Sequence, residues 1–351
     1  MDAESGRGSI LKLRFLRHVA VLDRADAMLG PEHFAHFNKQ RNSLSRLFVR
    51  SLEIESKLVS AASFSSFERH LNQLKRMLAN EIATCNLRTP HLFSTIYAGT
   101  YFGIRQAIEA DSIVAAIQIA KANKLISRDE HRWCTIALGR SLLKISNSTG
   151  HFAQYLKPKS QSHRRYIALR RRSLWAEWLN SLSEFSAIGS ASWRKQNKVF
   201  NQDSLLLIPE LARKKERPSV IYADPPYTDD QYSRFYHVLE TLCFYDYPTV
   251  SGAGLYRPNR FHTDFSVQSK APAALAQLIS AAARTSADLV LSYPTNGLVN
   301  KAGADIREML RLYFRRVEMC NSVPYFHSTF GASKGPARAP ATELIYLARS
   351  G

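Results

Sequence analysis

Val220-Ile221-Tyr222-Ala223-Asp224-Pro225-Pro226-Tyr227 is the stretch that decides the fold of this 351-residue sequence. Its four leading apolar residues are typical of a strand that is buried on both faces, as in a parallel sheet. Neither proline can donate a ladder hydrogen bond, so the strand is expected to stop after Ala223. The fixed φ angles of the prolines hold Asp224 and Tyr227 at the carboxyl end of the strand, where open α/β sheets bind ligands. The sequence therefore predicts an α/β protein with a site at this point.

The chemistry of this tetrapeptide suits a flat base that carries an amino group. Asp224 and the carbonyl group of Pro225 are acceptors that can bind both hydrogens of an exocyclic NH2. Tyr227 offers a ring on which the base can stack. We interpret Asp224, Pro225, Pro226 and Tyr227 as catalytic residues, and a proline-rich turn that merely ends a strand is the alternative.

The charge of the chain points to a polyanionic partner. The sequence holds 48 Lys and Arg against 29 Asp and Glu, a formal net charge of +19. Residues 131–176 contain ten Lys or Arg and no acidic residue, whereas a solvated helix face normally mixes signs. Aromatic side chains such as Phe152 and Tyr166, and amides such as Asn147, lie between these cations and suit contacts with bases. We therefore predict a basic, nucleic-acid-binding insertion over residues 145–195. Its predicted contacts are Lys157, Lys159, Arg164, Arg165, Arg170, Arg171 and Arg172.

The composition argues against other ligands and locations. Four cysteines are scattered without metal-ligand spacing, so we predict neither a metal site nor a disulfide framework. No apolar run approaches the ~20 residues of a membrane span, and Lys12, Arg14 and Arg17 interrupt the N-terminal apolar segment. We expect a soluble protein of the cytoplasm.

The first 90 residues are expected to be mostly helical. Ser65–Glu68 has the pattern of a capping box, and an apolar stripe of helical period follows from Phe67 to Ile82. Further on, Gly99 and Gly103 could serve a turn beside a ligand or mark the start of a helix.

Two acidic residues outside the tetrapeptide have simple interpretations. Asp111 lies within a helical pattern, where a solvated or capping role is expected. Asp203-Ser204 precedes the central strand by about one helix, and Asp203 is a natural N-cap before Leu205.

Aromatic residues are concentrated after the tetrapeptide. Eight of the 26 residues from Tyr222 to Tyr247 are Phe or Tyr, against 11% aromatic residues in the chain. A helix is predicted here, and Tyr232 or Tyr236 could join Tyr227 in stacking an extruded base. Ordinary core packing is the alternative for about half of these rings.

The sequence from Asp224 to Leu242 resembles the D12 class of adenine-specific DNA methyltransferases. The residues that carry the resemblance are Asp-Pro-Pro-Tyr and, after a short gap, Gln-Tyr-Ser-Arg-Phe-Tyr-His-Val-Leu-Glu-Thr-Leu. The class includes modification methylases of restriction systems. The resemblance extends through Arg257–Phe261, Leu289–Pro294 and Glu343–Tyr346, and covers about residues 92–349.

The resemblance implies a Rossmann-like methyltransferase sheet, S-adenosylmethionine as cofactor, and double-stranded DNA whose target adenine is flipped out. It assigns Asp224, Pro225 and Tyr227 to the adenine. It also assigns Asp224 to the cofactor site, and Asp203 and Ser204 match the family's cofactor-binding residues more weakly. The implied activity is site-specific methylation of adenine N6 in restriction-modification or phage defence, by in-line attack of N6 on the sulfonium methyl.

The sequence departs from this class in one respect. No Phe-x-Gly-x-Gly turn, which binds the methionine end of the cofactor, precedes the tetrapeptide. A different N-terminal segment could replace it, the chain could be shortened, or a second chain could supply it. A non-catalytic or split DNA-binding subunit is therefore one alternative. An RNA adenine methyltransferase is another, since the tetrapeptide and the positive charge suit either polymer.

The predicted organisation has three parts. Residues 1–90 form a helical segment, residues 91–144 and 196–351 the catalytic domain, and residues 145–195 the basic insertion. Lys334 and Arg338, in a loop before the last strand, could also touch DNA, and a companion restriction nuclease is a possible partner.

Overall fold

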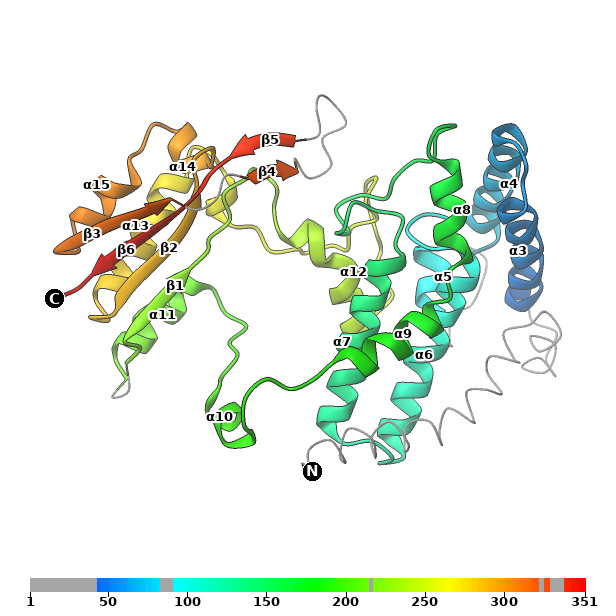
Figure 1. Cartoon of the computed structure of the whole chain (residues 1–351). Helices are drawn as coiled ribbons and strands as arrows, with labels where there is room; N and C mark the ends of the chain where they lie inside the picture. Colours follow the sequence, from blue (N-terminus) through cyan, green and yellow to red (C-terminus); the bar gives the residue numbers. More distant parts are fainter. Residues whose placement is uncertain (1–42, 83–90, 215–216, 322–324, 329–337) are drawn as a thin grey trace. The chain divides into compact units, whose positions relative to one another are not determined.

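The computed structural model describes residues 43–82, 91–214, 217–321, 325–328 and 338–351, which belong to two compact units (Figure 1). The first unit comprises the chain up to Ala187 together with Tyr236–Pro258. The second comprises Ile188–Phe235 and Asn259–Gly351. Helix α12 (Ser233–Phe244) begins in the second unit, and its residues from Tyr236 onward belong to the first.

The described elements of the first unit are helices. They are α3 (Ser43–Val59), α4 (Phe64–Ile82), α5 (Leu92–Ile96), α6 (Ile104–Ala122), α7 (Arg128–Ile145), α8 (His163–Arg171), α9 (Leu174–Glu184) and most of α12. The predicted helix near residue 65 is present as α4, but its cap is different. The hydroxyl of Ser63, rather than that of Ser65, accepts from the backbone N–H of Ser66 at 3.3 Å.

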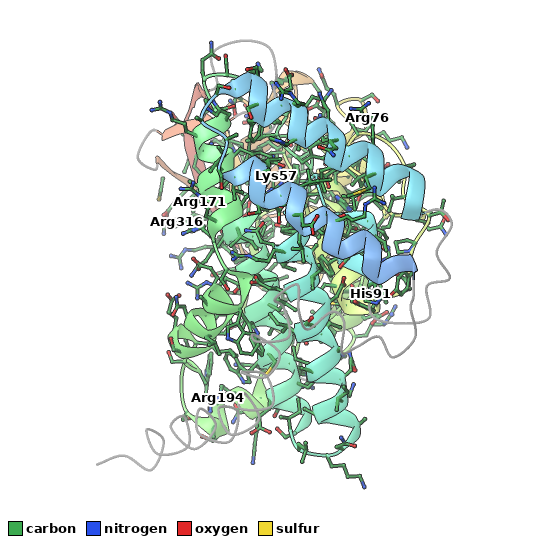
Figure 2. All side chains as sticks on the ribbon, turned by 90° about the vertical axis from the view of Figure 1, so that its right-hand side faces the viewer. Lys57, Arg76, His91, Arg171, Arg194 and Arg316 are labelled. Atoms are coloured by element: carbon green, nitrogen blue, oxygen red, sulfur yellow. The ribbon has the colours of Figure 1, made fainter. Side chains whose placement is uncertain are left out.

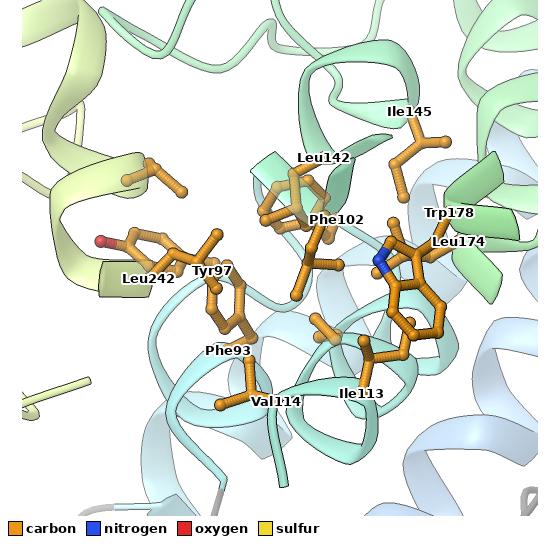
Figure 3. Close-up of a cluster of buried hydrophobic side chains, with 14 of the residues drawn as sticks. Phe93, Tyr97, Phe102, Ile113, Val114, Leu142, Ile145, Leu174, Trp178 and Leu242 are labelled. Atoms are coloured by element: carbon orange, nitrogen blue, oxygen red, sulfur yellow. The ribbon is translucent and has the colours of Figure 1, made fainter. Parts of the chain in front are cut away.

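Aromatic residues fill the core of the first unit (Figure 3). Tyr97, Phe102 and Trp178 are fully buried, and the Trp178 indole N–H donates to the carbonyl of Cys134 at 3.0 Å. Phe152 is also fully buried, and Tyr166 packs edge-on against Phe67 of α4. The prediction that Phe152 and Tyr166 contact bases is therefore wrong, because both rings belong to the protein interior.

Helix α6 begins at a carboxylate supplied by α3. Glu55 is buried, and its two oxygens accept from the backbone N–H groups of Ile104 and Arg105 at 2.9 and 3.0 Å. The first N–H groups of a helix have no partner within it, so Glu55 satisfies them. A Cβ atom at Gly103 would lie 2.3 Å from Glu55 Oε1, so only glycine fits there. This geometry supports the interpretation of Gly103 as the start of a helix.

Helix α6 in turn provides the carboxylate that begins α5. Asp111 accepts from the backbone N–H groups of Phe93 and Ser94 at 2.8 and 2.9 Å, and from the Tyr245 hydroxyl at 2.6 Å. Of the two roles expected for Asp111, capping is the one that the structure shows, because the side chain is buried rather than solvated. Burial raises its pKa to about 7, against the effect of these hydrogen bonds, which lower it.

A third carboxylate repeats the arrangement. Glu109, also on α6, accepts from the backbone N–H of Leu174 at 2.6 Å, at the start of α9. The hydroxyl of Ser141 on α7 lies 2.9 Å from that of Ser181 on α9. Three helices of this unit thus begin at acidic side chains that other helices hold in place.

The second unit contains the sheets. Its helical elements are α10 (Ala191–Gln196), α11 (Ser204–Ala212), η1 (Asp264–Ser266), α13 (Ala271–Ala283), α14 (Leu298–Lys301) and α15 (Ile306–Arg311). Its strands are β1 (Val220–Ala223), β2 (Asp288–Pro294), β3 (Arg316–Asn321), β4 (Tyr325–Ser328), β5 (Arg338–Ala341) and β6 (Glu343–Arg349). The larger sheet has the order β1-β2-β6-β3, with β1 parallel to β2 and the other pairs antiparallel; β4 and β5 form a separate antiparallel pair. The expected α/β class is confirmed.

One face of the four-stranded sheet forms the core of this unit. Ala223, Leu289 and Leu291 are buried there together with residues of α11, α13, α14 and α15. Val220 and Tyr222 point away from this core and are 55% and 63% exposed. The prediction that this strand is buried on both faces is therefore wrong, since β1 pairs with β2 alone among the described strands.

The two units divide the chain differently from the predicted boundaries. Residues 91–144 pack with the helical unit rather than with the sheet, and residues 145–187 are integrated into that unit. Lys334 lies outside the described residues, and Arg338 is on β5.

Three features of composition can be compared with the described residues. None of their helices is both long and apolar enough to cross a membrane. In the same residues, no group of three or more His, Cys, Asp or Glu is placed to hold a metal ion. Cys134, Cys243 and Cys320 are free thiols.

The Asp111→Asn substitution should change how stability depends on pH. Because the folded-state pKa is raised, the Asp111 contribution is fully present below pH 4 and is lost as pH rises to 7, by about 4 kcal/mol. The Asp111→Asn variant should lack this part of the slope. It should also be less stable in acid, since an NH2 group faces backbone donors. Guanidinium unfolding followed by tryptophan fluorescence at pH 4 to 8 measures both effects. Asp129→Asn, at an exposed position, is the control, and equal slopes in all three proteins would contradict the assignment.

Candidate functional site

The Asp-Pro-Pro-Tyr tetrapeptide directly follows β1, as the sequence predicted. Ala223 pairs with Leu291, so β2 continues beside the tetrapeptide as far as Pro294. Pro225 is buried, whereas Asp224 is exposed. The strand therefore delivers the Asp224 carboxylate to solvent at the carboxyl end of a parallel pair.

Tyr227 is fixed by the turn that follows β2. Its ring lies edge-on to that of Tyr293, with centroids 6.3 Å apart, and its carbonyl accepts from the N–H of Leu298 at 3.0 Å. The Tyr293 hydroxyl accepts from the N–H of Val299 at 3.1 Å. A Cβ atom at Gly297 would lie 2.3 Å from the Tyr293 ring, so glycine is needed at this helix start. The position of Tyr227 thus depends on a segment 70 residues away.

The loop after the tetrapeptide is held by a reciprocal amide pair. The Gln231 side chain donates to the carbonyl of Thr263 at 3.1 Å and accepts from the Thr263 N–H at 2.8 Å. The Ser266 hydroxyl donates to the carbonyl of Asp230 at 3.2 Å, and Arg234 pairs with the Asp230 carboxylate at 3.0 Å. These contacts order the path from the tetrapeptide into α12.

A second acid lies near Asp224. Partial burial raises the pKa of Asp224, and the negative charge of Glu343 on β6 raises it further. Glu343 itself accepts a short hydrogen bond from the hydroxyl of Ser292 on β2. The carboxyl end of the sheet therefore carries two neighbouring carboxyl groups and a hydroxyl.

Asp203 is the N-cap of α11, which confirms the capping interpretation. Its Oδ1 accepts from the N–H of Leu205 at 2.9 Å, and the side chain is exposed. Ser204 is the first residue of that helix. A role of Asp203 and Ser204 toward a cofactor stays a prediction.

The three tyrosines predicted to stack on a base fall into different units. Tyr227 and Tyr232 are half-buried members of the second unit, and the Tyr232 ring lies 5.6 Å from that of Phe235. Tyr236 is 50% exposed and belongs to the first unit. Tyr227 and Tyr232 therefore belong to the same unit as the tetrapeptide, and Tyr236 does not.

The basic residues predicted to contact nucleic acid divide by exposure. Lys157, Lys159, Arg164 and Arg165 are exposed around the start of α8. Arg170 is instead buried and is removed from the set. Its guanidinium donates to two internal carbonyls and to the hydroxyl of Tyr166, all within 3.1 Å.

Other cations of the run have partners within the protein. Arg171, on α8 (Figure 2), donates to the carbonyl of Val59 at 2.8 Å. Arg172 donates to the carbonyl of Lys144 at 3.0 Å and lies 3.3 Å from a Glu177 oxygen. Two cations of α7 also have acidic partners on α9: Arg140 lies 2.6 Å from Glu184, and Lys144 lies near Glu177 and Glu184. Within residues 131–176, the exposed cations with neither a described ion pair nor a described hydrogen bond to a carbonyl are Lys157, Lys159, Arg164 and Arg165.

Two site residues were missed from the sequence. Ser292 and Glu343 lie 68 and 119 positions beyond Asp224, in stretches that carry the family resemblance but in which no residue was assigned a role. Only the pairing of β2 with β6 brings them to the same sheet end.

Comparison with known proteins finds a family model that matches part of this chain. Residues 138–289 match the model of the D12 class N6 adenine-specific DNA methyltransferases. The resemblance inferred from the sequence is confirmed. The matched segment includes residues of both units and contains the Asp-Pro-Pro-Tyr tetrapeptide.

Curated relatives are modification methylases of modest identity. Modification methylase StsI of Streptococcus sanguinis is 25% identical over 210 residues, 60% of this chain and 29% of the relative. Modification methylase LlaI of Lactococcus lactis subsp. lactis is 28% identical over 176 residues, 49% of this chain and 25% of the relative. Type II methyltransferase M.FokI of Planomicrobium okeanokoites is 31% identical over 158 residues, 45% of this chain and 21% of the relative.

The matches span only part of these relatives. The chain covers less than a third of the length of each. No solved structure matches the chain at a significant level.

Replacing Glu343 with Gln should lower the pKa of Asp224. Removal of the nearby negative charge favours the ionised form of Asp224, while the amide oxygen of Gln can still accept from Ser292. Titration of the Asp224 carboxyl carbon by NMR in aspartate-labelled protein measures the shift. Glu308→Gln, on α15, serves as the control. An unchanged Asp224 titration in the Glu343 variant would refute the coupling.

Proposed function

We propose that this protein acts in the transfer of a methyl group from S-adenosylmethionine to adenine N6 in double-stranded DNA. Its own contribution is the adenine-binding half of the site. The observation that carries the proposal is the Asp-Pro-Pro-Tyr tetrapeptide at the carboxyl end of β1, where Asp224 is exposed and the segment is fixed through Tyr227 and Gln231. The match to the D12 class supports it.

The adenine would be held by acceptors and a ring. The ionised Asp224 carboxylate and the Pro225 carbonyl accept the two hydrogens of the N6 amino group, which increases electron density on nitrogen. Tyr227 stacks on the base. Because the reaction relies on positioning, the rigid attachment of Tyr227 to the turn after β2 has a direct role in it.

The described residues lack two features expected of a pocket for S-adenosylmethionine. The 351 residues contain no Phe-x-Gly-x-Gly turn, and β1 has no second neighbour among the described strands. Asp203, the weaker match to a cofactor ligand, already caps α11. No residue of this chain is therefore assigned to the cofactor beyond the edge formed by Asp224.

The phosphate backbone would bind at the exposed cations near α8. Lys157, Lys159, Arg164 and Arg165 form a group of like charges without described acidic partners, which suits a polyanion. Since the relatives are named modification methylases, we place the activity in restriction-modification or phage defence, acting at a specific sequence.

Asp224→Ala should abolish adenine methylation while leaving DNA affinity nearly unchanged. The variant loses the acceptor for the N6 hydrogens but keeps the cations near α8. The measurement is N6-methyladenine in genomic DNA and in structured RNA of cells that carry the chain, together with DNA binding by the purified protein. Asp264→Ala, which removes an exposed ion pair with Lys270, is the control. Undiminished methylation in the Asp224 variant would rule out the site, and methylation confined to RNA would rule out DNA as the substrate.

The Arg164→Ala/Arg165→Ala variant should bind duplex DNA roughly tenfold more weakly at moderate salt. If each side chain neutralises one phosphate, the slope of log affinity against log salt should fall by about 2. Fluorescence anisotropy at several salt concentrations measures both quantities. Arg140→Ala, which removes a cation paired with Glu184, should leave the slope unchanged. Equal slopes for the double variant and the wild type would exclude this surface.

A further inference from the structure

The four-stranded sheet of the second unit is incomplete at one edge. Among the described strands β1 pairs only with β2, so the other edge of β1 presents its backbone groups without a ladder. Such an edge is a template for another strand. The edge here belongs to the strand that carries Asp224.

On one face of the same sheet, the described residues leave apolar side chains partly exposed. Register aligns Tyr222 with Val290 and Val290 with Leu347, so an apolar row crosses β1, β2 and β6. Tyr222 is 63% exposed, Val290 and Leu347 are only partly buried, and none of them belongs to the core of the unit. Domains bury such faces against a second layer, which this unit lacks on the Tyr222 side among its described residues.

Exposed apolar side chains are concentrated in the segment of sequence that leads into β1. Seven of the seventeen large hydrophobic residues that are exposed in the described chain lie within residues 188–222, about a tenth of the sequence. They are Ile188, Trp193, Val199, Phe200, Leu206, Val220 and Tyr222. Single exposed hydrophobics are ordinary, but Val220 and Tyr222 lie two residues apart on β1 and therefore share one face of the sheet.

The uncovered face leads directly to the candidate site. Side chains alternate along a strand, so Asp224 follows Tyr222 on this face, and Ser292 follows Val290. The effect of Glu343 on the pKa of Asp224, and its hydrogen bond from Ser292, agree with this placement. Whatever covers the apolar row therefore reaches the Asp224 carboxylate.

We infer that the β1 edge and the Tyr222 face are the docking surface for a second polypeptide that carries the cofactor-binding half of the methyltransferase. It adds an apolar strand parallel to β1, covers the row with helices, and brings the glycine-rich turn that this sequence lacks. The inference rests on the proposed function, since that function requires S-adenosylmethionine beside Asp224. The chain matches less than a third of each relative, which leaves ample sequence in those proteins for such a half.

The test uses tagged full-length chains expressed in their native host. The wild type is compared with Tyr222→Arg, which places a charge in the row, and with Leu312→Arg, a matched change at a 77% exposed residue of the same unit. Purified material is examined by mass spectrometry, light scattering and calorimetric titration with S-adenosylmethionine.

The expected result is a stoichiometric partner whose sequence contains a glycine-rich turn, in a complex that binds S-adenosylmethionine. Tyr222→Arg should lose the partner and weaken cofactor binding at least tenfold, whereas Leu312→Arg should keep both. A homodimer that Tyr222→Arg dissociates would assign the surface to a second copy and overturn the inference. A monomer would also overturn the inference. Hydrogen exchange of the β1 backbone amides would then tell whether the edge is free or whether deletion of residues 1–42 is needed to expose it, and either result counts against a second polypeptide. Retention of the partner by Tyr222→Arg would overturn the choice of surface.

The proposed function is tested by a separate measurement. Adenine methylation of duplex DNA is measured with the purified complex. A Tyr222-dependent complex that binds S-adenosylmethionine but does not methylate adenine would leave the docking surface standing and would reject the proposed function. Methylation by a monomer would do the opposite.

Discussion

The parallel pairing of β1 with β2 is the interaction on which the candidate site depends. It aligns the carboxyl ends of two strands that are 65 residues apart, so that Asp224 and Ser292 emerge at one end of the sheet. Antiparallel pairing of β6 with β2 then brings Glu343 to the same end from the opposite chain direction. The two prolines stop β1 at this point, and a longer strand would carry the acid away from its neighbours.

In the helical unit, buried carboxylates have the comparable role. Glu55, Asp111 and Glu109 each satisfy backbone donors at the start of another helix. Taking an acid out of water is costly, and the raised pKa values of all three express that cost. The compensation is orientation, because each carboxylate fixes the beginning of one helix relative to the body of another.

The sequence predicted the elements better than their surroundings. The α/β class, the end of β1, the strand at Leu289 and the cap at Asp203 all follow from local patterns, and all are present. Burial was harder to predict, since it depends on what packs from elsewhere in the chain. The sequence pattern predicts that Val220 and Tyr222 are buried, yet both are exposed, because β1 has a described neighbour on one side only.

The prediction for the basic residues was wrong in the opposite sense, because a residue expected at the surface is buried. Arg170 read as a surface cation, although its carbonyl acceptors come from a turn 70 residues earlier. Glu343 lies in a stretch that carries the family resemblance, but its position near Asp224 arises from strand pairing and could not be predicted from that stretch. Local pattern therefore identified the tetrapeptide, and tertiary structure supplied its electrostatic environment.

Gly103, Glu55 and Arg170 have a consequence for how this protein can evolve. A Cβ atom at residue 103 would lie 2.3 Å from Glu55 Oε1 and 2.9 Å from Arg170 Cδ, so three distant positions share one small volume. A larger residue at position 103 would clash with Glu55 and Arg170. Loss of either charged side chain would leave the other charge buried or leave an empty space. Homologous sequences should therefore keep the three residues together or exchange them together, and this covariation would mark the lineage in which the helical unit has kept this geometry.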